Sequence, residues 1–127
     1  EKAYGVAEYL LNRYGRRLNA VFASSAVGTD AMLTGLRNFN LTEQVHLVGY
    51  EASVTSLEAI KSGEIKGLVV SNPYRMGYLG VTTLVDNIQG GNIPTIVDTG
   101  VTLVTQSNID SSEVREALGV GESEAIR

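Results

Sequence analysis

Four short apolar runs in this chain are each followed by polar side chains that could bind a ligand. Hydroxyl, amide and carboxylate groups at such places donate and accept hydrogen bonds. If the apolar runs are parallel strands, their carboxyl ends share one edge of a sheet, which is where α/β proteins bind ligands. The pattern therefore predicts a polar site that binds rather than catalyses. The four places are Ser24-Ser25, Tyr50-Glu51, Ser71-Asn72 and Asp98-Thr99.

Signatures of catalysis and of phosphate binding are missing. The chain has neither G-x-G-x-x-G after a strand nor G-x-x-x-x-G-K-[ST], and it has no Cys. Its one histidine, His46, lies inside an apolar run, so we interpret it as a strand residue rather than a general base. Neither Ser24 nor Ser25 stands in the G-x-S-x-G turn of a hydrolase. The acidic residues are not grouped as metal ligands. We therefore predict no catalytic residue, no metal site and no cofactor.

The composition is that of one acidic globular domain. The chain has 127 residues, of which 43% are hydrophobic and 19% charged, so it has enough apolar material for a core. The formal net charge of -4 argues against binding of DNA or RNA, which requires a basic surface. No apolar run approaches the ~20 residues of a membrane-spanning helix. Glu1 is not an initiator Met, so we expect a processed or partial chain.

Helical and extended patterns alternate along the chain. Strands that alternate with helices favour a doubly wound α/β domain, whose parallel sheet is covered on both faces by right-handed crossovers. Because no repeat or linker divides residues 1–127, we predict a single domain. The expected helices lie within 4–14, 26–39, 53–62, 73–90 and 110–118, and the expected strands at 18–23, 45–50, 65–70 and 95–105. Residues 53–55 are expected to cap one helix, with Thr55-x-x-Glu58 as a candidate capping box. Asn72-Pro73 and Asp110-x-x-Glu113 are further expected helix starts.

Five ordered blocks of the sequence carry a family resemblance. They are Ala20–Ser25, Val48–Glu51, Leu57–Ile65, Val70–Gly77 and Asp98–Thr105. Over these blocks the chain resembles the C-terminal lobe of type I periplasmic sugar-binding proteins, the ribose-binding-protein-like substrate-binding components of ABC transporters. The resemblance covers most of the chain, and the stretch from Leu57 to Gly77 is its most specific part.

The resemblance implies an incomplete two-lobe architecture. Members of the family have two lobes that are joined by three crossing strands and clamp a ligand between them. Residues 1–127 would then form part of the C-terminal lobe, and the N-terminal lobe and the first βαβ unit of the second would be absent. Residues 98–109 would comprise the last hinge crossing and a strand, from 102 onward, of the absent lobe's sheet. A chain with such unpaired strands is expected to be found with the rest of its own protein, as a strand-exchanged homo-oligomer, or partly disordered beyond Gly100. The expected hinge residues are Asp98, Thr99 and Gly100.

Three positions carry over from the ligand contacts of the family. Ser25 stands where an Asn is usual, Glu51 where an Asp is usual, and Ser71 where a Gln is common. In the family these side chains hydrogen-bond sugar hydroxyls, and a carboxylate suits this role because it accepts two donors. The two shorter serines imply a wider pocket, which disfavours ribose. Ser24 and Asn72 are secondary candidates, and helix capping is the alternative role of Ser71 and Asn72.

By resemblance, the function is that of the solute-binding component of an ABC importer, which binds a sugar or sugar-like small molecule by hinge closure. The expected partners are this small molecule, the remainder of the two-lobe protein and an ABC permease. The expected location is extracytoplasmic, in the periplasm or as a cell-surface lipoprotein. Two alternatives use the same fold: the ligand-sensing domain of a LacI-type transcriptional repressor, and that of a membrane sensor kinase. The residues upstream of Glu1 would distinguish them.

Overall fold

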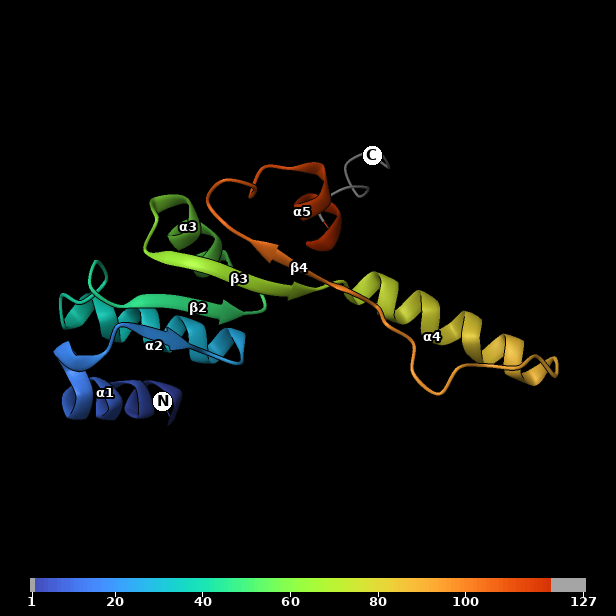
Figure 1. The fold of residues 1–127 in the computed structure, drawn as a ribbon, viewed down its shortest axis with the longest axis horizontal. Coiled ribbons are helices and arrows are strands. Elements are labelled where there is room, and N and C mark those ends of the chain that lie inside the picture. Colours follow the sequence, from blue (N-terminus) through green and yellow to red (C-terminus); the bar gives the residue numbers. More distant parts are fainter. Residues whose placement is uncertain (1, 120–127) are drawn as a thin grey trace.

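Four strands form one sheet in the computed structural model, which describes residues 2–119 (Figure 1). The strands lie in the order β1-β2-β3-β4, with β1 to β3 parallel and β4 antiparallel to β3. The predicted α/β class is therefore confirmed, and one strand runs against the predicted direction. The elements are α1 (Lys2–Tyr14), the 3-10 helix η1 (Gly15–Arg17), β1 (Ala20–Phe22), α2 (Ala26–Asn38), β2 (His46–Tyr50), α3 (Val54–Ser62), β3 (Ile65–Ser71), α4 (Pro73–Ile88), β4 (Val101–Val104) and α5 (Ser112–Ala117).

Side-chain caps start α2, α3, α4 and α5, although the two predicted capping boxes do not form. Ser53, one of the predicted caps, forms a reciprocal capping box with Ser56 at the start of α3, and the candidate box Thr55-x-x-Glu58 does not form. Ser111 caps α5, in place of the predicted Asp110-x-x-Glu113. Both capping serines have extended backbone angles, as an N-cap residue requires. Thr55 already lies inside a helix and cannot serve as its cap.

The core lies on one face of the sheet. The connections from β1 to β2 and from β2 to β3 advance in the same direction across the sheet, so right-handed crossovers place α2 and α3 on the same face. The α1 helix packs on α2. The strand residues that point toward these helices are fully or almost fully buried, as expected for a packed core: Leu47, Leu68, Val70 and Val104.

The opposite face of the sheet is largely uncovered, which differs from the predicted covering on both faces. The strand register places Phe22, Val48, Val69 and Leu103 together on this second face. Phe22 is 59% exposed and Leu103 is 54% exposed. A mainly parallel sheet normally carries helices on both faces. The described residues therefore supply the helices of one face only.

An ion pair joins the end of α2 to the start of β3. The Arg37 guanidinium donates to both carboxylate oxygens of Glu64, at 2.8 and 2.7 Å, and the Ser62 hydroxyl donates to the same carboxylate at 2.9 Å. The hydrogen bonds from Arg37 lower the pKa of Glu64 to about 2, with a further contribution from Ser62. The same pairing raises the pKa of Arg37. This pair is remote from the polar strand ends.

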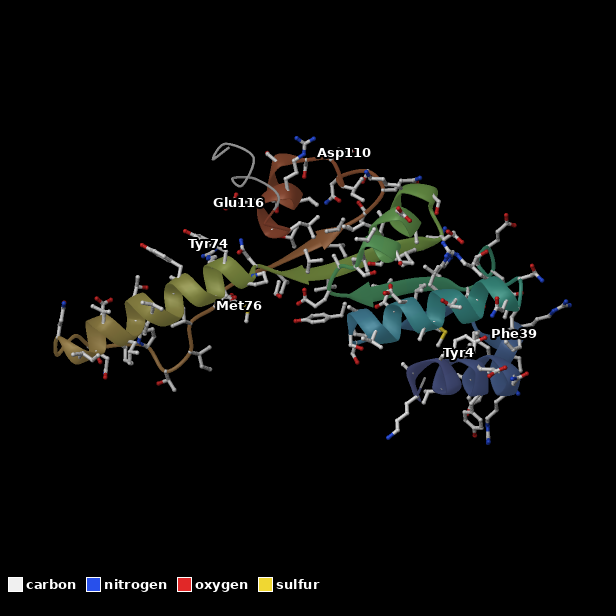
Figure 2. All side chains as sticks on the ribbon, turned by 180° about the vertical axis from the view of Figure 1, so that it is seen from behind. Tyr4, Phe39, Tyr74, Met76, Asp110 and Glu116 are labelled. Carbon is white, nitrogen blue, oxygen red and sulfur yellow. The ribbon has the colours of Figure 1, made fainter. Side chains whose placement is uncertain are left out.

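The α4 helix and the segment that follows it form an arm, residues 73–100, which projects away from the sheet (Figure 1). No residue of α4 is buried, although the predicted apolar face is present. Figure 2 shows Tyr74 and Met76 close to the root of the arm. Within residues 2–119, no helix combines the length and the apolar character needed to cross a bilayer. The exposed side chains of the apolar face are Tyr74, Tyr78, Val81, Val85 and Ile88.

The position of β4 corrects the expectation that residues from 102 onward belong to the sheet of another lobe. Val101–Val104 pairs with β3 of this chain, from Ser71 opposite Val101 to Leu68 opposite Val104. The cause is the arm, because the chain leaves the sheet at Ser71 and returns beside the same strand. Because β4 is paired, the reason given for strand exchange no longer applies. Among the described residues, the arm is the element whose apolar face is left exposed.

Candidate ligand-binding site

The polar strand ends lie at one edge of the sheet, as the sequence predicts. The carboxyl ends of β1, β2 and β3 share this edge because the three strands are parallel. Ser25, Glu51 and Ser71 occupy these ends. Asp98 and Thr99 reach the same edge for a different reason, since they precede the antiparallel β4 rather than follow a parallel strand.

Glu51 and Ser71 form the centre of the candidate site. The Ser71 hydroxyl donates to Oε1 of Glu51 at 2.5 Å, across neighbouring strands. The Glu51 amide donates to the Val69 carbonyl at 2.8 Å, which extends the pairing of β2 and β3 by one residue. No hydrogen bond from residues 2–119 reaches the other carboxylate oxygen, and the side chain is half-buried. The carboxylate can therefore accept donors from a ligand at the sheet edge.

The backbone of Glu51 is unusual. Its φ angle is +61°, in the left-handed region that a residue with a side chain rarely adopts. Such angles persist only where the surrounding structure holds them, and they cluster at functional sites. This turn bends the chain immediately after β2 and leaves the carboxylate beside Ser71. The backbone angle and the contact with Ser71 therefore support Glu51 as the leading candidate for a ligand contact at this edge.

Two of the candidate residues have structural partners. The Ser25 hydroxyl accepts a hydrogen bond from the Gly28 amide at 3.1 Å and caps α2. The Asn72 side chain accepts from the Arg75 amide at 2.9 Å and caps α4, so the alternative role of Asn72 is present. Ser25 is nevertheless exposed, and its hydroxyl retains a proton that it can donate.

Ser24 and the predicted hinge lie on either side of this centre. Ser24 is exposed beside Ser25. The Gly100 amide donates to Oδ1 of Asp98 at 2.8 Å, which closes a short turn around Thr99 just before β4. Gly100 has a φ angle of +73°, which glycine adopts without strain. This turn is the point where the arm rejoins the sheet.

Sequence reasoning missed two residues next to this site, Thr29 and Asp30 in the first turns of α2. The Thr29 hydroxyl donates to the Ser25 carbonyl at 2.9 Å and accepts from the Tyr50 amide at 3.3 Å. Asp30 accepts a hydrogen bond from the Ser53 hydroxyl at 2.7 Å. Their partners lie far away in sequence, so no local pattern marks them. The available signal was a polar Thr-Asp pair inside the helix that follows the first strand.

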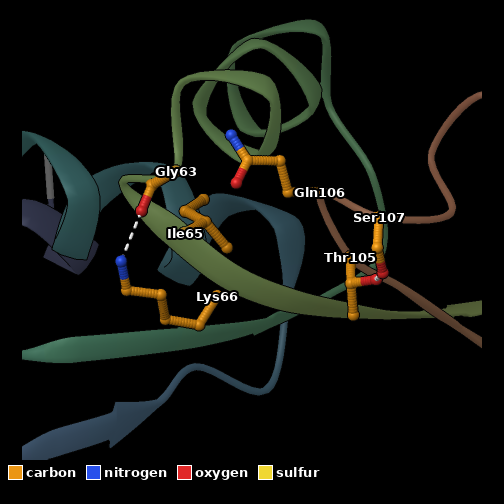
Figure 3. A pocket seen from close by; sticks show the side chains of 6 residues that line it. All are labelled: Gly63, Ile65, Lys66, Thr105, Gln106 and Ser107. Carbon is orange, nitrogen blue, oxygen red and sulfur yellow. Dashed lines mark hydrogen bonds between the residues drawn. The ribbon is translucent and has the colours of Figure 1, made fainter.

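A cavity of about 260 Å³ lies at the other edge of the sheet (Figure 3). The polar groups that line it already bond to the protein: Lys66 Nζ donates to the Gly63 carbonyl at 2.6 Å, and the Thr105 and Ser107 hydroxyls bond each other at 2.9 Å. Gln106 donates to a carbonyl of α3 at 2.8 Å. This cavity lies at the opposite edge of the sheet from Glu51 and Ser71, so it is not the candidate site.

A second cavity, of similar size, lies at the root of the arm. Arg75 of α4, Gly100 and two acidic residues of α5, Glu113 and Glu116, line it. Figure 2 shows Glu116 on α5 beside the start of the arm. Among residues 2–119 no group of acidic residues and His46 has the arrangement of a metal site. Within the described residues, this charged cavity therefore lies beside the predicted hinge residue Gly100 and holds no metal-ligand group.

Known proteins resemble both the sequence and the fold. A family model described as a periplasmic binding protein domain matches residues 1–92, while a comparison with curated protein sequences finds no match. An ABC transporter solute-binding protein from Agrobacterium vitis with bound D-fucose superposes with a TM-score of 0.81 at 24% identity. A carbohydrate transporter solute-binding protein from Agrobacterium radiobacter, in complex with D-arabinose, gives a TM-score of 0.80 at 30% identity.

A further solute-binding protein from Agrobacterium vitis, bound with alpha-D-tagatopyranose, gives a TM-score of 0.80 at 26% identity. Each of these three matches covers 91% of this chain but only 39% of the solved protein. The chain thus spans about two-fifths of the length of these structures. Since the family model accounts for residues 1–92 and the sheet topology agrees with the solved structures, the chain belongs to the family of periplasmic binding protein domains.

Proposed function

We propose that this chain is part of one lobe of a two-lobe solute-binding protein, which binds a sugar or sugar-like molecule for an ABC importer. The observation that carries the proposal is the pair of Glu51 and Ser71 at the carboxyl edge of the sheet. This edge is where a ligand meets an α/β sheet. Three solved proteins that are similar to the chain are solute-binding proteins with bound sugars, which supports the same ligand class.

Sugar binding at this edge follows from the chemistry of the carboxylate. A sugar presents several hydroxyl donors, and one carboxylate accepts two of them at once. A hydrogen bond to a charged group is stronger than a neutral one. In the proposed complex, Glu51 accepts ligand hydroxyls, and the Ser71 hydroxyl either shares the carboxylate or turns toward the ligand. The Ser25 hydroxyl donates a hydrogen bond to the ligand, and Ser24 and Asn72 lie beside these residues.

Three observations support a second lobe. The apolar face of α4 is exposed, one face of the sheet is largely uncovered, and the chain spans 39% of its solved matches. We propose that the remainder of the protein covers these surfaces and that the lobes close by bending at Asp98, Thr99 and Gly100. The other proposed partner is an ABC permease, and the proposed location is extracytoplasmic. A binding protein of this kind makes and breaks no covalent bond.

The test is calorimetric titration of the complete protein with D-arabinose, D-fucose and D-tagatose. We expect Glu51→Ala to weaken binding of the sugar that binds best by ~100-fold, because two hydrogen bonds to a charged acceptor contribute about 3 kcal/mol. Ser71→Ala should weaken binding by a smaller factor. Glu58→Gln is the matched control, since Glu58 is an exposed acidic residue of α3 away from the edge. Unchanged affinity in Glu51→Ala would contradict the proposed site.

A further inference from the structure

The first turns of α2 hold the chain on both sides of Glu51. On one side, the Tyr50 amide donates to the Thr29 hydroxyl at 3.3 Å. On the other side, the Ser53 hydroxyl donates to Oδ1 of Asp30 at 2.7 Å. Glu51 lies between these two attachments with its left-handed φ angle of +61°. A helix that is packed into the core thus fixes both ends of a four-residue turn.

Thr29 is placed for this role with little freedom. Its side chain is fully buried, and its hydroxyl both donates to the Ser25 carbonyl and accepts from the Tyr50 amide. It lies so close to β2 that only glycine fits opposite it: a Cβ on Gly49 would lie 2.4 Å from Thr29 Cγ2 and 2.6 Å from its Oγ1. The hydroxyl therefore joins the ends of β1 and β2, which carry Ser25 and Glu51.

We propose that Thr29 and Asp30 are positioning residues for Glu51. They hold the left-handed turn that keeps the carboxylate at the sheet edge, beside Ser71, before any ligand arrives. Without them, the glutamate backbone would relax toward the ordinary regions that a side chain prefers. The ligand would then have to order the turn as it binds, which weakens affinity. This inference rests on the proposed function for its effect on binding, but not for its effect on the turn itself.

The first experiment replaces the hydroxyl of Thr29 in the complete protein. Thr29→Val keeps the shape of the side chain and removes both hydrogen bonds, whereas Thr29→Ser keeps the hydroxyl. Thr34→Val is the matched control, because Thr34 lies on the same helix and donates to the Asp30 carbonyl at 2.8 Å, but it is exposed and does not touch the turn. We expect the exchange of the Tyr50 amide hydrogen to accelerate at least tenfold in Thr29→Val, and by less than twofold in Thr29→Ser and Thr34→Val.

The second experiment measures affinity for D-arabinose, D-fucose and D-tagatose by calorimetry. For the sugar that binds best, we expect Thr29→Val to lower the affinity by about tenfold and Thr34→Val to lower it by less than twofold. Asp30→Ala provides a second variant with little risk to folding, since Asp30 is only partly buried. Because a positioning residue acts through Glu51, Asp30→Ala should weaken binding several-fold in the natural protein and have no further effect in a Glu51→Ala background.

The outcomes separate this inference from the proposed function. If Glu51→Ala abolishes sugar binding while Thr29→Val and Asp30→Ala bind like Thr34→Val, the positioning roles are wrong and the site stands. An equal loss from Asp30→Ala in both backgrounds also overturns the inference, since Asp30 would then act without Glu51. If no sugar binds, the proposed function fails, and the exchange of the Tyr50 amide hydrogen still tests the inference. Equal exchange rates in Thr29→Val and Thr34→Val overturn the inference.

Discussion

Gly49→Ala is expected to destabilise the protein much more than a glycine replacement elsewhere in the sheet. An added Cβ would lie 2.4 and 2.6 Å from two Thr29 atoms and 2.7 Å from Leu68 Cδ2, where carbon atoms normally keep at least ~3.5 Å apart. Thr29 and Leu68 are both fully buried, so neither can move into open space. Overpacking of this kind costs about 1–3 kcal/mol.

Two smaller effects adjust this estimate. Moving Thr29 away from β2 lengthens its hydrogen bond to Tyr50, and the loss of one such bond costs about 1 kcal/mol. Replacing a strand glycine by alanine also stabilises the folded state by about 0.5–1 kcal/mol, because it lowers the conformational entropy of the unfolded chain. The net expected loss in the free energy of unfolding is therefore about 2 kcal/mol for Gly49→Ala.

Equilibrium unfolding in urea measures this loss. Gly67→Ala is the control, because its Cβ would meet Leu103 Cδ1 at 3.2 Å, and this side chain is 54% exposed and free to turn. We expect Gly67→Ala to change the free energy of unfolding by less than about 0.5 kcal/mol. In a Thr29→Ala background, Gly49→Ala should cost less than half as much, since the two closest atoms are gone. Equal costs for the two glycines, or no dependence on Thr29, would refute the packing argument.

Three other predictions concern the ion pair, the hinge and the arm. The pKa of Glu64 is lowered to about 2, below its unfolded value, so the pair with Arg37 stabilises the fold above pH 4.5 and loses its effect as the pH falls from 4.5 to 2. In this partly exposed pair the contribution is about 1 kcal/mol, and urea midpoints of Arg37→Gln should vary less over that interval than those of the natural protein. Gly100→Val should impair lobe closure, seen by small-angle scattering as no ligand-induced compaction, because valine disfavours the φ angle of +73°. The 127-residue chain alone should self-associate in analytical ultracentrifugation through the exposed face of α4, and Val81→Ser with Val85→Ser should reduce this association, whereas unchanged association would contradict that role of the face.

The sequence indicates most of the elements because their causes are local. Apolar residues three and four apart on α2, and an Asn-Pro start on α4, suffice to place these helices. The polar residues after β1, β2 and β3 lie at one edge because parallel strands share it. The roles of Ser25, Glu51 and Ser71 as ligand contacts stay a prediction. Their placement at one edge follows from the alternating pattern alone.

The remaining features depend on contacts between distant residues, so the sequence does not reveal them. The direction of β4 is set by where the arm returns, and an extended segment near Gly100 reads the same for either direction. The attachment of Thr29 to Tyr50 joins residues of two different elements and leaves no periodic mark. The sequence also does not show that one sheet face is uncovered, because the strand residues of that face are apolar whether or not a helix covers them.

The way the arm is attached also limits how it can move. Both of its connections run through paired strands, and the last pair before the arm is Ser71 opposite Val101. Beyond Val69 the register pairs β3 with β4 alone, so these two strands connect the arm to the sheet. Ser71 is the last residue of β3 and is hydrogen-bonded to Glu51 on the neighbouring strand. Movement of the arm about these two strands would therefore pull on the hydrogen bond between Ser71 and Glu51, at the edge that we propose to bind the ligand.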